Sequence, residues 1–184
     1  MSPPATRARG STRERLLAAA AAVVRRAGPR GLTLEAVAAE AGVSKGGLLY
    51  HFHTKRDLVR GLLADWMDGF EADVERNAED DAGGWTRAYV RESDMTRAAP
   101  GERDAEFSLL AMLIDAPEEL DPLRERYRAW QARIDDDGID PVDATLARLA
   151  ADGLWYADLL DLAPPTGKQR AELLKRLDAL ATDD

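Results

Sequence analysis

Residues 33–58 read TLEAVAAEAGVSKGGLLYHFHTKRDL, and they carry two short helix patterns separated by a glycine. Thr33 is a natural N-cap for the first helix, whose valine and alanines form an apolar face. Gly42 follows that helix, because glycine takes the left-handed conformation that ends helices at little cost. Ser44 then caps a second helix, which we expect to end near Phe52. The pattern predicts a helix-turn-helix, a motif that places its second helix in the major groove of DNA.

Helices are also expected on both sides of this motif. Residues 12–27 form an amphipathic helix that ends at Gly28-Pro29. On the other side, a long helix begins after Thr54 and reaches about Asp80. The remainder shows further helical segments separated by glycines and prolines, with no convincing strand pattern. The fold class is therefore predicted to be all-α.

Charge is distributed unevenly along the chain. Residues 1–60 carry eleven Lys or Arg and four Asp or Glu, which gives a net charge of +7. Of the totals of 25 basic and 34 acidic residues, the rest of the chain keeps 14 and 30, a net charge of −16. A basic end followed by an acidic remainder suits a protein that contacts a polyanion with that end alone.

Composition excludes several kinds of site. The chain has no cysteine, which excludes disulfides, thiolate zinc sites and cysteine nucleophiles. Its two histidines, His51 and His53, are too few for sites that need several imidazoles. We therefore expect no metal, no cofactor and no enzyme activity. The apolar run from Leu16 to Val24 is too short to span a membrane and lacks a cleavage site, so we expect a cytoplasmic protein without a membrane partner.

Three helix N-termini are candidates for phosphate binding. Thr33, Ser44 and Thr54 each offer a hydroxyl and exposed amides, although plain capping is expected at all three. Lys55 adds a positive charge beside the third cap. Lys45 begins the second helix of the motif and is the candidate for a base contact, with a phosphate contact as the alternative.

Two glycines stand inside the second helix of the motif. Gly46 and Gly47 each cost about 0.5–1 kcal/mol relative to alanine, and close approach of the helix to DNA explains them. Sequence preference would then depend partly on DNA shape. Tyr50 and His51 end the helix, where each could donate to a phosphate; the alternative for Tyr50 is packing on the following helix.

The motif resembles the DNA-binding module of the TetR family of one-component transcriptional regulators. The positions that match the family pattern in register are Thr33, Val37, Ala38, Ala41, Gly42, Val43, Ser44, Gly46, Leu48, Tyr50, Phe52 and Lys55. Leu49 stands where an aromatic residue is more usual. The resemblance covers residues from about 11 to 60, and beyond them it concerns architecture only.

The resemblance implies two helical domains. Residues 1–53 would form the three-helix DNA-binding domain, and residues 54–184 a domain for ligand sensing and dimerisation. A flexible arm with Arg7 and Arg9 precedes the first helix and could enter the minor groove, with a solvated tail as the alternative.

The family also implies a mechanism for the protein. A homodimer would bind a palindromic double-stranded DNA operator and block transcription until a small hydrophobic ligand releases it. Activation is the alternative mode of regulation. A helical adaptor that binds protein partners and docks through its basic N-terminal region is the alternative class of protein.

The C-terminal domain is rich in aromatic and methionine side chains that suit an adaptable ligand pocket, with ordinary core packing as the alternative for each. The predicted lining residues are Trp66, Phe70, Trp85, Tyr89, Phe107, Leu110, Met112, Tyr127 and Trp130. The surplus of acids leaves two interpretations. Either the ligand is a cation with Glu92, Asp94 or Glu106 as counter-ion, or these carboxylates lie on solvated faces.

Two C-terminal helices present apolar stripes that the resemblance assigns to dimerisation. The candidate interface residues are Leu146, Leu149, Ala150, Gly153, Tyr156, Ala157, Leu160, Leu173, Leu177 and Leu180. Two such helices from each chain would form a self-complementary four-helix interface. Packing of the same stripes within one chain is the alternative.

Overall fold

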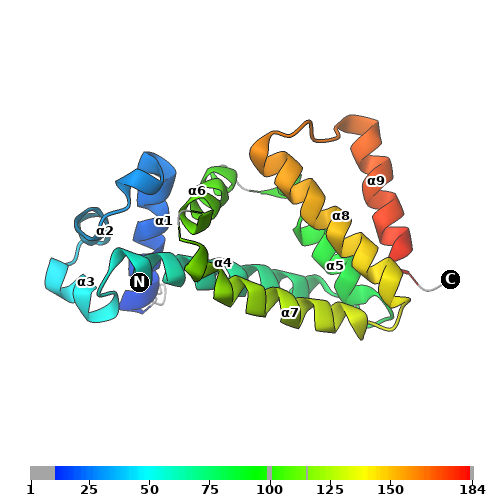
Figure 1. The fold of residues 1–184 in the computed structure, drawn as a ribbon, viewed down its shortest axis with the longest axis horizontal. Helices are drawn as coiled ribbons and strands as arrows, with labels where there is room; N and C mark the ends of the chain where they lie inside the picture. The colour runs from blue at the N-terminus through cyan, green and yellow to red at the C-terminus, as the bar shows by residue number, and fades with distance from the viewer. Residues whose placement is uncertain (1–10, 99–100, 115, 183–184) are drawn as a thin grey trace, which may run out of the picture. The chain divides into compact units, whose positions relative to one another are not determined.

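The computed structural model describes residues 11–98, 101–114 and 116–182 (Figure 1). These residues form helices and turns without any strand, which confirms the predicted all-α class. The predicted arm with Arg7 and Arg9 lies outside the described residues. Across the described ranges, no helix is long and apolar enough to cross a membrane.

The chain separates into two compact units, one ending at Asp65 and one beginning at Trp66. We call the first unit the head and the second the body. The predicted domain boundary at residues 53 and 54 differs from this division, which falls inside one helix. The difference arises because Leu58 and Leu63, early in that helix, are buried and complete the apolar core of the head.

Helix α1 (Thr12–Gly31) opens the head with the predicted capping box. The Ser11 hydroxyl accepts from the backbone N–H of Glu14 at 3.2 Å, and the Glu14 carboxylate accepts from Ser11 N–H at 3.0 Å. The helix breaks at the predicted Gly28-Pro29, but a short further turn to Gly31 was not predicted. Gly28 has a φ of 67° and kinks the helix, and one further turn follows because Pro29 is well suited to begin a turn.

Helices α2 (Leu34–Ala41) and α3 (Lys45–His51) form the predicted helix-turn-helix. The hydroxyls of Thr33 and Ser44 each accept from the backbone N–H three residues later, at 3.1 and 3.0 Å. Gly42 adopts the left-handed conformation between them, with a φ of 64°. Both caps and the turn are therefore as the sequence predicts.

Helix α4 (Lys55–Asn77) begins in the head and ends in the body, three residues before the predicted end. Thr54 and Asp57 cap it reciprocally: the hydroxyl accepts from Asp57 N–H at 3.1 Å, and the carboxylate accepts from Thr54 N–H at 2.9 Å. The pKa of the Asp57 carboxyl is lowered because the Thr54 hydroxyl hydrogen-bonds to its ionised form.

The body continues with helices of very different lengths. In chain order they are α5 (Gly84–Glu92), the 3-10 turn η1 (Met95–Arg97), α6 (Glu102–Ile114), the 3-10 turn η2 (Pro117–Leu120), α7 (Asp121–Asp135), α8 (Pro141–Leu160) and α9 (Gly167–Leu180). Helices α5, α8 and α9 pack against one another, and α7 packs against α5 and α8 (Figure 1).

Aromatic rings form the centre of the body. Tyr89 and Trp130 are buried, and the centroid of each ring lies 5.1 Å from that of Phe70. The Tyr89 hydroxyl donates to Asp152 at 2.7 Å, and Arg148 donates to the other oxygen of that carboxylate at 2.7 Å. Burial raises the pKa of both Tyr89 and Asp152. This cluster joins α4, α5, α7 and α8.

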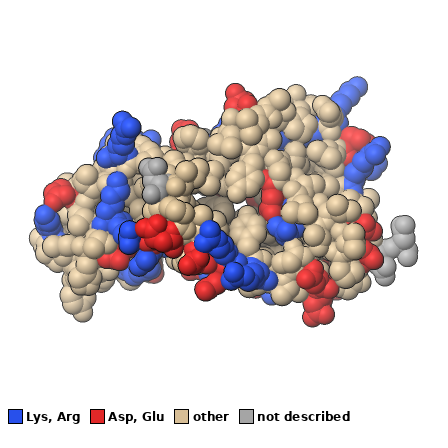
Figure 2. Space-filling view, viewed as in Figure 1, with Lys and Arg blue, Asp and Glu red and all other residues tan. Residues whose placement is uncertain are grey.

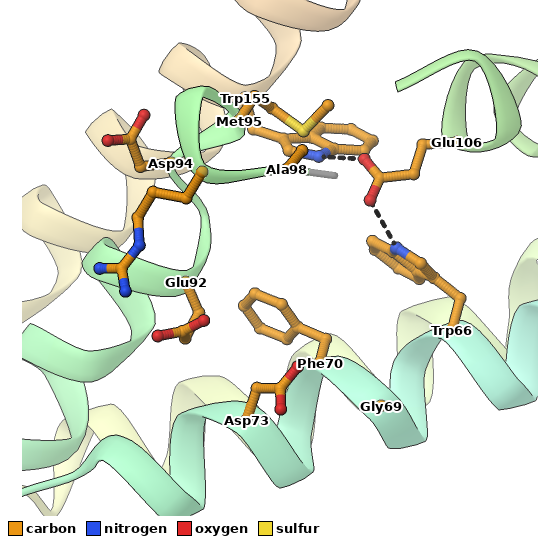
Figure 3. Close-up of a pocket in the computed structure, with 11 residues that line it drawn as sticks. Trp66, Gly69, Phe70, Asp73, Glu92, Asp94, Met95, Ala98, Glu106 and Trp155 are labelled. Atoms are coloured by element: carbon orange, nitrogen blue, oxygen red, sulfur yellow. Dashed lines mark hydrogen bonds between the residues drawn. The ribbon is translucent and has the colours of Figure 1, made fainter. Parts of the chain in front are cut away.

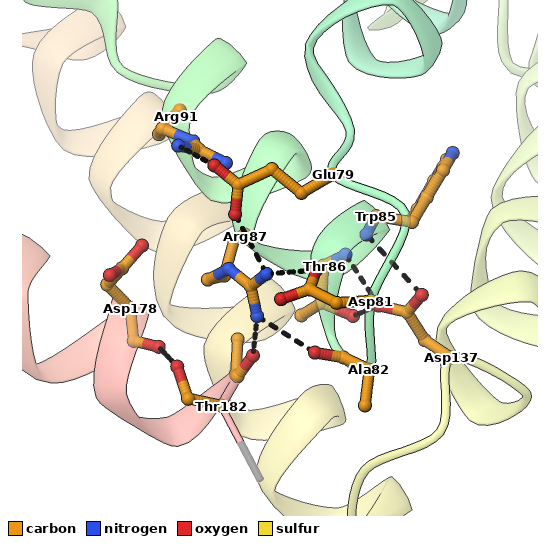
Figure 4. A network of polar contacts seen from close by, with 11 residues as sticks. Glu79, Asp81, Ala82, Trp85, Thr86, Arg87, Arg91, Asp137, Asp178 and Thr182 are labelled. Atoms are coloured by element: carbon orange, nitrogen blue, oxygen red, sulfur yellow. Dashed lines mark hydrogen bonds and ion pairs between the residues drawn. The ribbon is translucent and has the colours of Figure 1, made fainter.

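A buried arginine fixes the C-terminal end of the body (Figure 4). Arg87 donates to the carbonyl oxygens of Ala82 and Ala181 at 2.9 and 2.8 Å, and it also hydrogen-bonds to the carboxylates of Glu79 and Asp81. Burial alone would lower the pKa of Arg87, but these acidic partners outweigh it and raise the pKa. The guanidinium thereby holds the end of α9 against the loop before α5.

A second buried arginine connects α9, α8 and the turn η1. Arg170 donates to both carboxylate oxygens of Asp158, at 3.0 and 2.6 Å, and also to Asp94. Burial alone would raise the pKa of Asp94, but the hydrogen bonds from Arg170 and Thr96 outweigh it and lower the pKa. Asp94 is therefore held as a carboxylate.

Candidate functional site

The candidate DNA-binding residues gather on the exposed surface of the head. Thr33, Ser44, Lys45, Gly46, Gly47, Tyr50, Thr54 and Lys55 are exposed, and His51 is half-buried. The side chain of Tyr50 is 81% exposed, so it does not pack on α4, and its ring meets that of His51 edge-on at 5.1 Å. Several Lys and Arg side chains project from the head in the face seen in Figure 2. The surface is thus open to a polyanion.

The two candidate lysines each contact another residue of the head at its surface. Lys45 pairs with Glu35 across 2.6 Å, and this hydrogen bond lowers the pKa of Glu35. Lys55 donates to the carbonyl oxygen of Pro29 at 3.1 Å. Exposed pairs of this kind contribute little to folding, so a phosphate can replace the partner at small cost.

The fold does not require glycine at either position in α3. A Cβ atom at Gly46 would meet nothing nearer than the Ser44 hydroxyl at 3.9 Å, and at Gly47 the same atom lies at 3.4 Å. Neither glycine has a positive φ. Alanine would fit both positions and would favour the helix, so the fold of the head does not explain the two glycines. Their effect is to leave this surface of α3 without side chains.

A cavity of about 430 Å³ lies in the body (Figure 3). Its lining comes from α4, α5, the segment around η1, α6 and α8, and consists of Trp66, Gly69, Phe70, Asp73, Glu92, Asp94, Met95, Arg97, Ala98, Glu106 and Trp155. Trp66 and Phe70 are the predicted pocket residues that this cavity contains. The three predicted counter-ions, Glu92, Asp94 and Glu106, also line it.

The structure places the other predicted pocket residues outside this cavity. Tyr89, Met112 and Trp130 are buried in the core, and Trp85 lines a separate hollow among acidic side chains. Phe107 is exposed on α6, and Leu110 and Tyr127 are half-buried. These side chains do not line this cavity, because a large apolar side chain fits a filled core as well as a hollow one.

Sequence reasoning missed Trp155, which forms one wall of the cavity. The neighbouring residue gave a signal in the sequence. Tyr156 continues the exposed stripe of α8, and successive residues of a helix point about 100° apart, so Trp155 points away from that stripe. Trp155 is accordingly less exposed than Tyr156 and reaches Glu106.

Glu106 organises the aromatic wall of the cavity. Its carboxylate accepts from the indole N–H of Trp66 at 3.1 Å and from that of Trp155 at 2.7 Å (Figure 3). The ring of Phe70 stacks beside Trp66 with centroids 6.2 Å apart. The two indoles are therefore held with their N–H edges toward α6.

The predicted dimer stripe is exposed on α8. Leu146 and Leu149 are 50% and 52% exposed, and Tyr156 and Leu160 continue the same face. Gly153 lies among them, and a Cβ atom there would meet nothing within 4 Å. Ala150 and Ala157 are half-buried beside the stripe.

Helix α9 offers less to a partner than predicted. Leu177 is only 4% exposed, because it packs inside the chain where α9 meets α5 and α8. Its assignment to a dimer interface was therefore wrong. Leu173 and Leu180 are half-buried.

Comparison with known proteins identifies the family. An exposed helix-turn-helix followed by a separate helical unit is typical of DNA-binding transcriptional regulators. The model of bacterial regulatory proteins of the tetR family matches residues 16–62, and that of the tetracyclin repressor-like C-terminal domain matches residues 83–182. The chain belongs to the TetR family of transcriptional regulators, which confirms the resemblance and the absence of an enzymatic role. It also removes the adaptor alternative.

Solved structures share this fold over nearly their whole length. A putative transcriptional regulator from Streptomyces coelicolor A3(2) is 21% identical, with a TM-score of 0.74 over 94% of this chain and 99% of that one. A TetR family member from Streptomyces coelicolor A3 is 26% identical, with a TM-score of 0.69 over 91% and 98%. The multidrug binding protein EbrR complexed with ethidium is 28% identical, with a TM-score of 0.68 over 91% and 98%.

Proposed function

We propose that the protein is a repressor that leaves its operator when a small hydrophobic ligand fills the cavity of the body. In this proposal the head reads the operator, and the body senses the ligand and dimerises. The observation that carries the proposal is the cavity, since three aromatic rings line it at Trp66, Phe70 and Trp155. Its relative EbrR was solved with ethidium, an aromatic compound, which supports an aromatic-lined ligand site here.

Operator binding rests on the exposed surface of α3 and the caps beside it. Lys45 begins the recognition helix, where side chains reach base edges, and Thr33, Ser44 and Thr54 stand where phosphates bind helix N-termini. Bare Gly46 and Gly47, with Tyr50, His51 and Lys55 nearby, complete the proposed contact surface.

Dimerisation rests on the apolar stripe of α8. Leu146, Leu149, Tyr156 and Leu160 expose large side chains along one face, which suits a second copy of the same helix. Gly153 allows the two helices to approach closely. A two-fold dimer presents two α3 helices to two half-sites, so the operator is expected to be palindromic.

Release follows from linkage between the two sites. A ligand that favours the DNA-incompetent state must bind that state more tightly, and operator DNA must weaken ligand binding by the same factor. The test needs a variant that fills the cavity while the rest of the protein remains unchanged. Gly69 lines the cavity on α4, and a Cβ atom there meets nothing within 4 Å, so a Gly69→Trp side chain can enter the space.

The experiment selects operator fragments by gel shift and then adds a panel of hydrophobic compounds. Wild type should release the operator with at least one compound, whereas Gly69→Trp should bind the operator equally well and resist release. Tryptophan fluorescence reports occupancy directly, because Trp66 and Trp155 line the cavity. Equal release of both proteins would show that the cavity is not the sensing site. A promoter fusion whose transcription falls when the gene is deleted would identify an activator instead.

Dimerisation is tested separately by sedimentation. Wild type should be a dimer at micromolar concentration, and Gly153→Glu should dissociate it because two carboxylates would face each other in an apolar interface. An unchanged dimer mass in this variant would reject the α8 interface.

A further inference from the structure

We infer that the cavity of the body selects organic cations with apolar groups over neutral and anionic molecules of the same size. This inference rests on the proposed function, since it names the chemical class of the ligand at the same site. It is carried by the charge of the lining, by the aromatic wall and by the position of one carboxylate, Glu92.

The lining is strongly acidic. It includes four carboxylates, Asp73, Glu92, Asp94 and Glu106, and one guanidinium, that of Arg97. Arg97 is exposed, so solvent screens its charge more than it screens the half-buried Glu92 and Glu106. A cation that enters the cavity therefore meets a favourable field, and an anion meets an unfavourable one.

Glu92 differs from two of the other carboxylates in its partners. Asp94 is paired with Arg170, and Asp73 is paired with Arg76, so a cation of this chain already offsets each charge. Glu92 accepts a hydrogen bond from the neutral amide of Asn77 at 3.0 Å, and it forms no ion pair with any residue that the structure describes. Its negative charge is therefore one that a ligand can pair.

The aromatic wall provides the second feature that favours a cation. The indoles of Trp66 and Trp155 are fixed by their N–H groups on Glu106, and their centroids lie 6.0 Å apart. Figure 3 shows the two indoles and Phe70 around the open space, with Glu92 on the side away from Trp66 and Asp73 beside Phe70 on α4. Aromatic faces attract cations, most strongly at tryptophan and away from water.

These features act on different parts of one ligand. Its apolar groups gain by leaving water for the aromatic wall, as those of a neutral compound would. The charge adds attraction to the ring faces and to Glu92, which a neutral compound lacks. An anion of the same shape pays for approaching the carboxylates without a compensating partner.

The test uses three phenyl compounds of different charge, of which the cation and the anion carry four phenyl groups and the neutral compound three. Tetraphenylphosphonium is a cation, tetraphenylborate is an anion of nearly identical shape, and triphenylphosphine oxide is neutral. Calorimetric titration of the full-length protein should give about tenfold tighter binding for the cation than for the neutral compound, and no detectable binding of the anion. Equal or tighter binding of the neutral compound or the anion would overturn the inference.

A substitution locates the effect at the proposed carboxylate. Glu92→Gln should weaken binding of the cation about fivefold while changing that of triphenylphosphine oxide less than about twofold. Glu125→Gln is the matched control, because it removes the same charge from an exposed position on α7 outside the cavity, and it should leave both affinities unchanged. A loss shared equally by both compounds would reject a role for the charge of Glu92. The wild-type series needs no substitution and decides the inference even if Glu92→Gln unfolds.

The two proposals fail in different ways. If Gly69→Trp abolishes release by the neutral compound and by the cation at equal concentrations, the cavity is the sensing site but does not select charge. If neither compound binds wild type and Gly69→Trp behaves as wild type with every compound in the panel, the sensing site itself is rejected.

Discussion

Two pairs of glycines look alike in the sequence but have opposite roles in the head and the body. A Cβ atom at Gly83 would lie 1.9 Å from the carbonyl oxygen of Ala181, and one at Gly84 would lie 2.1 Å from that of Glu79. In the body, therefore, glycine allows backbone to pack on backbone. At Gly46 and Gly47 of the head, a Cβ atom would meet no backbone from outside its own helix. A glycine that the fold does not need indicates a surface kept bare for a partner.

The charged side chains of the two units differ in how exposed they are. The ion pairs of the head, such as Lys45 with Glu35 and Arg26 with Glu40, lie on exposed side chains. In the body, Arg87 and Arg170 are buried among carboxylates and carbonyl oxygens. Charges of the head remain available to a ligand, whereas these two charges of the body hold the fold together.

The largest effect is expected for Gly83→Ala in the body. The added methyl group collides with backbone at Ala181, and Gly83 has a φ of 75°, so the substitution should lower the free energy of unfolding by on the order of 3 kcal/mol. Urea unfolding followed by tryptophan fluorescence measures this, since all four tryptophans lie in the body. A loss below about 1 kcal/mol would show that the close packing at Gly83 is not required.

Gly47→Ala in the head should weaken operator binding without lowering the stability of the protein. Alanine fits and favours the helix by about 0.5–1 kcal/mol, so stability should not fall. Operator affinity should fall about tenfold, because the methyl group holds the helix away from DNA. Gel shift and circular dichroism melting on the same preparation measure both quantities. Full operator affinity would remove the argument for close approach.

Asp94→Asn tests the buried charge network of the body. Arg170 loses one of its two acidic partners, and the free energy of unfolding at neutral pH should fall by about 1 kcal/mol. The folded-state pKa of Asp94 lies below its ordinary value of 3.8, so this stabilisation is present above that pH and is lost as the pH falls through the folded-state pKa. Wild type and variant should therefore converge in acid.

Glu35→Gln is the matched control in the head for that experiment. Glu35 is also paired and its pKa is also lowered, but its carboxylate is exposed. Its stability should be that of wild type at every pH. Urea midpoints of both variants between pH 2 and 7 make the comparison, and parallel curves for Asp94→Asn and wild type down to pH 2 would contradict the linkage.

The smallest change in DNA affinity is expected for Lys55→Ala. Loss of one phosphate contact should weaken binding to all DNA sequences by about threefold and reduce the salt slope by about one ion. Lys45→Ala should in addition relax preference at one base position. Affinities measured over a range of salt concentrations separate the two lysines, and unchanged values in both variants would reject this surface as the DNA contact.

The sequence by itself determined the head. Its caps at Thr33, Ser44 and Thr54 and its turn at Gly42 depend on atoms no more than a few residues away, so each can be predicted from the local sequence. The break at Gly28 is also a local effect of the sequence, and only the turn of helix that follows it was not predicted. In the body, the net charge suggested a cationic ligand with Glu92, Asp94 or Glu106 as counter-ion, but it did not distinguish these from carboxylates on solvated faces.

Only the tertiary structure decided which side chains surround the cavity. Tyr89 and Trp130 are large aromatic residues like Trp66 and Trp155, yet the first two fill the core and the last two face open space. The role of Glu106 in the cavity depends on hydrogen bonds from two indoles that lie 40 and 49 residues away in the sequence. Periodicity identifies the face of a helix that turns away from water, but whether that face meets a side chain or a hollow depends on how distant helices pack.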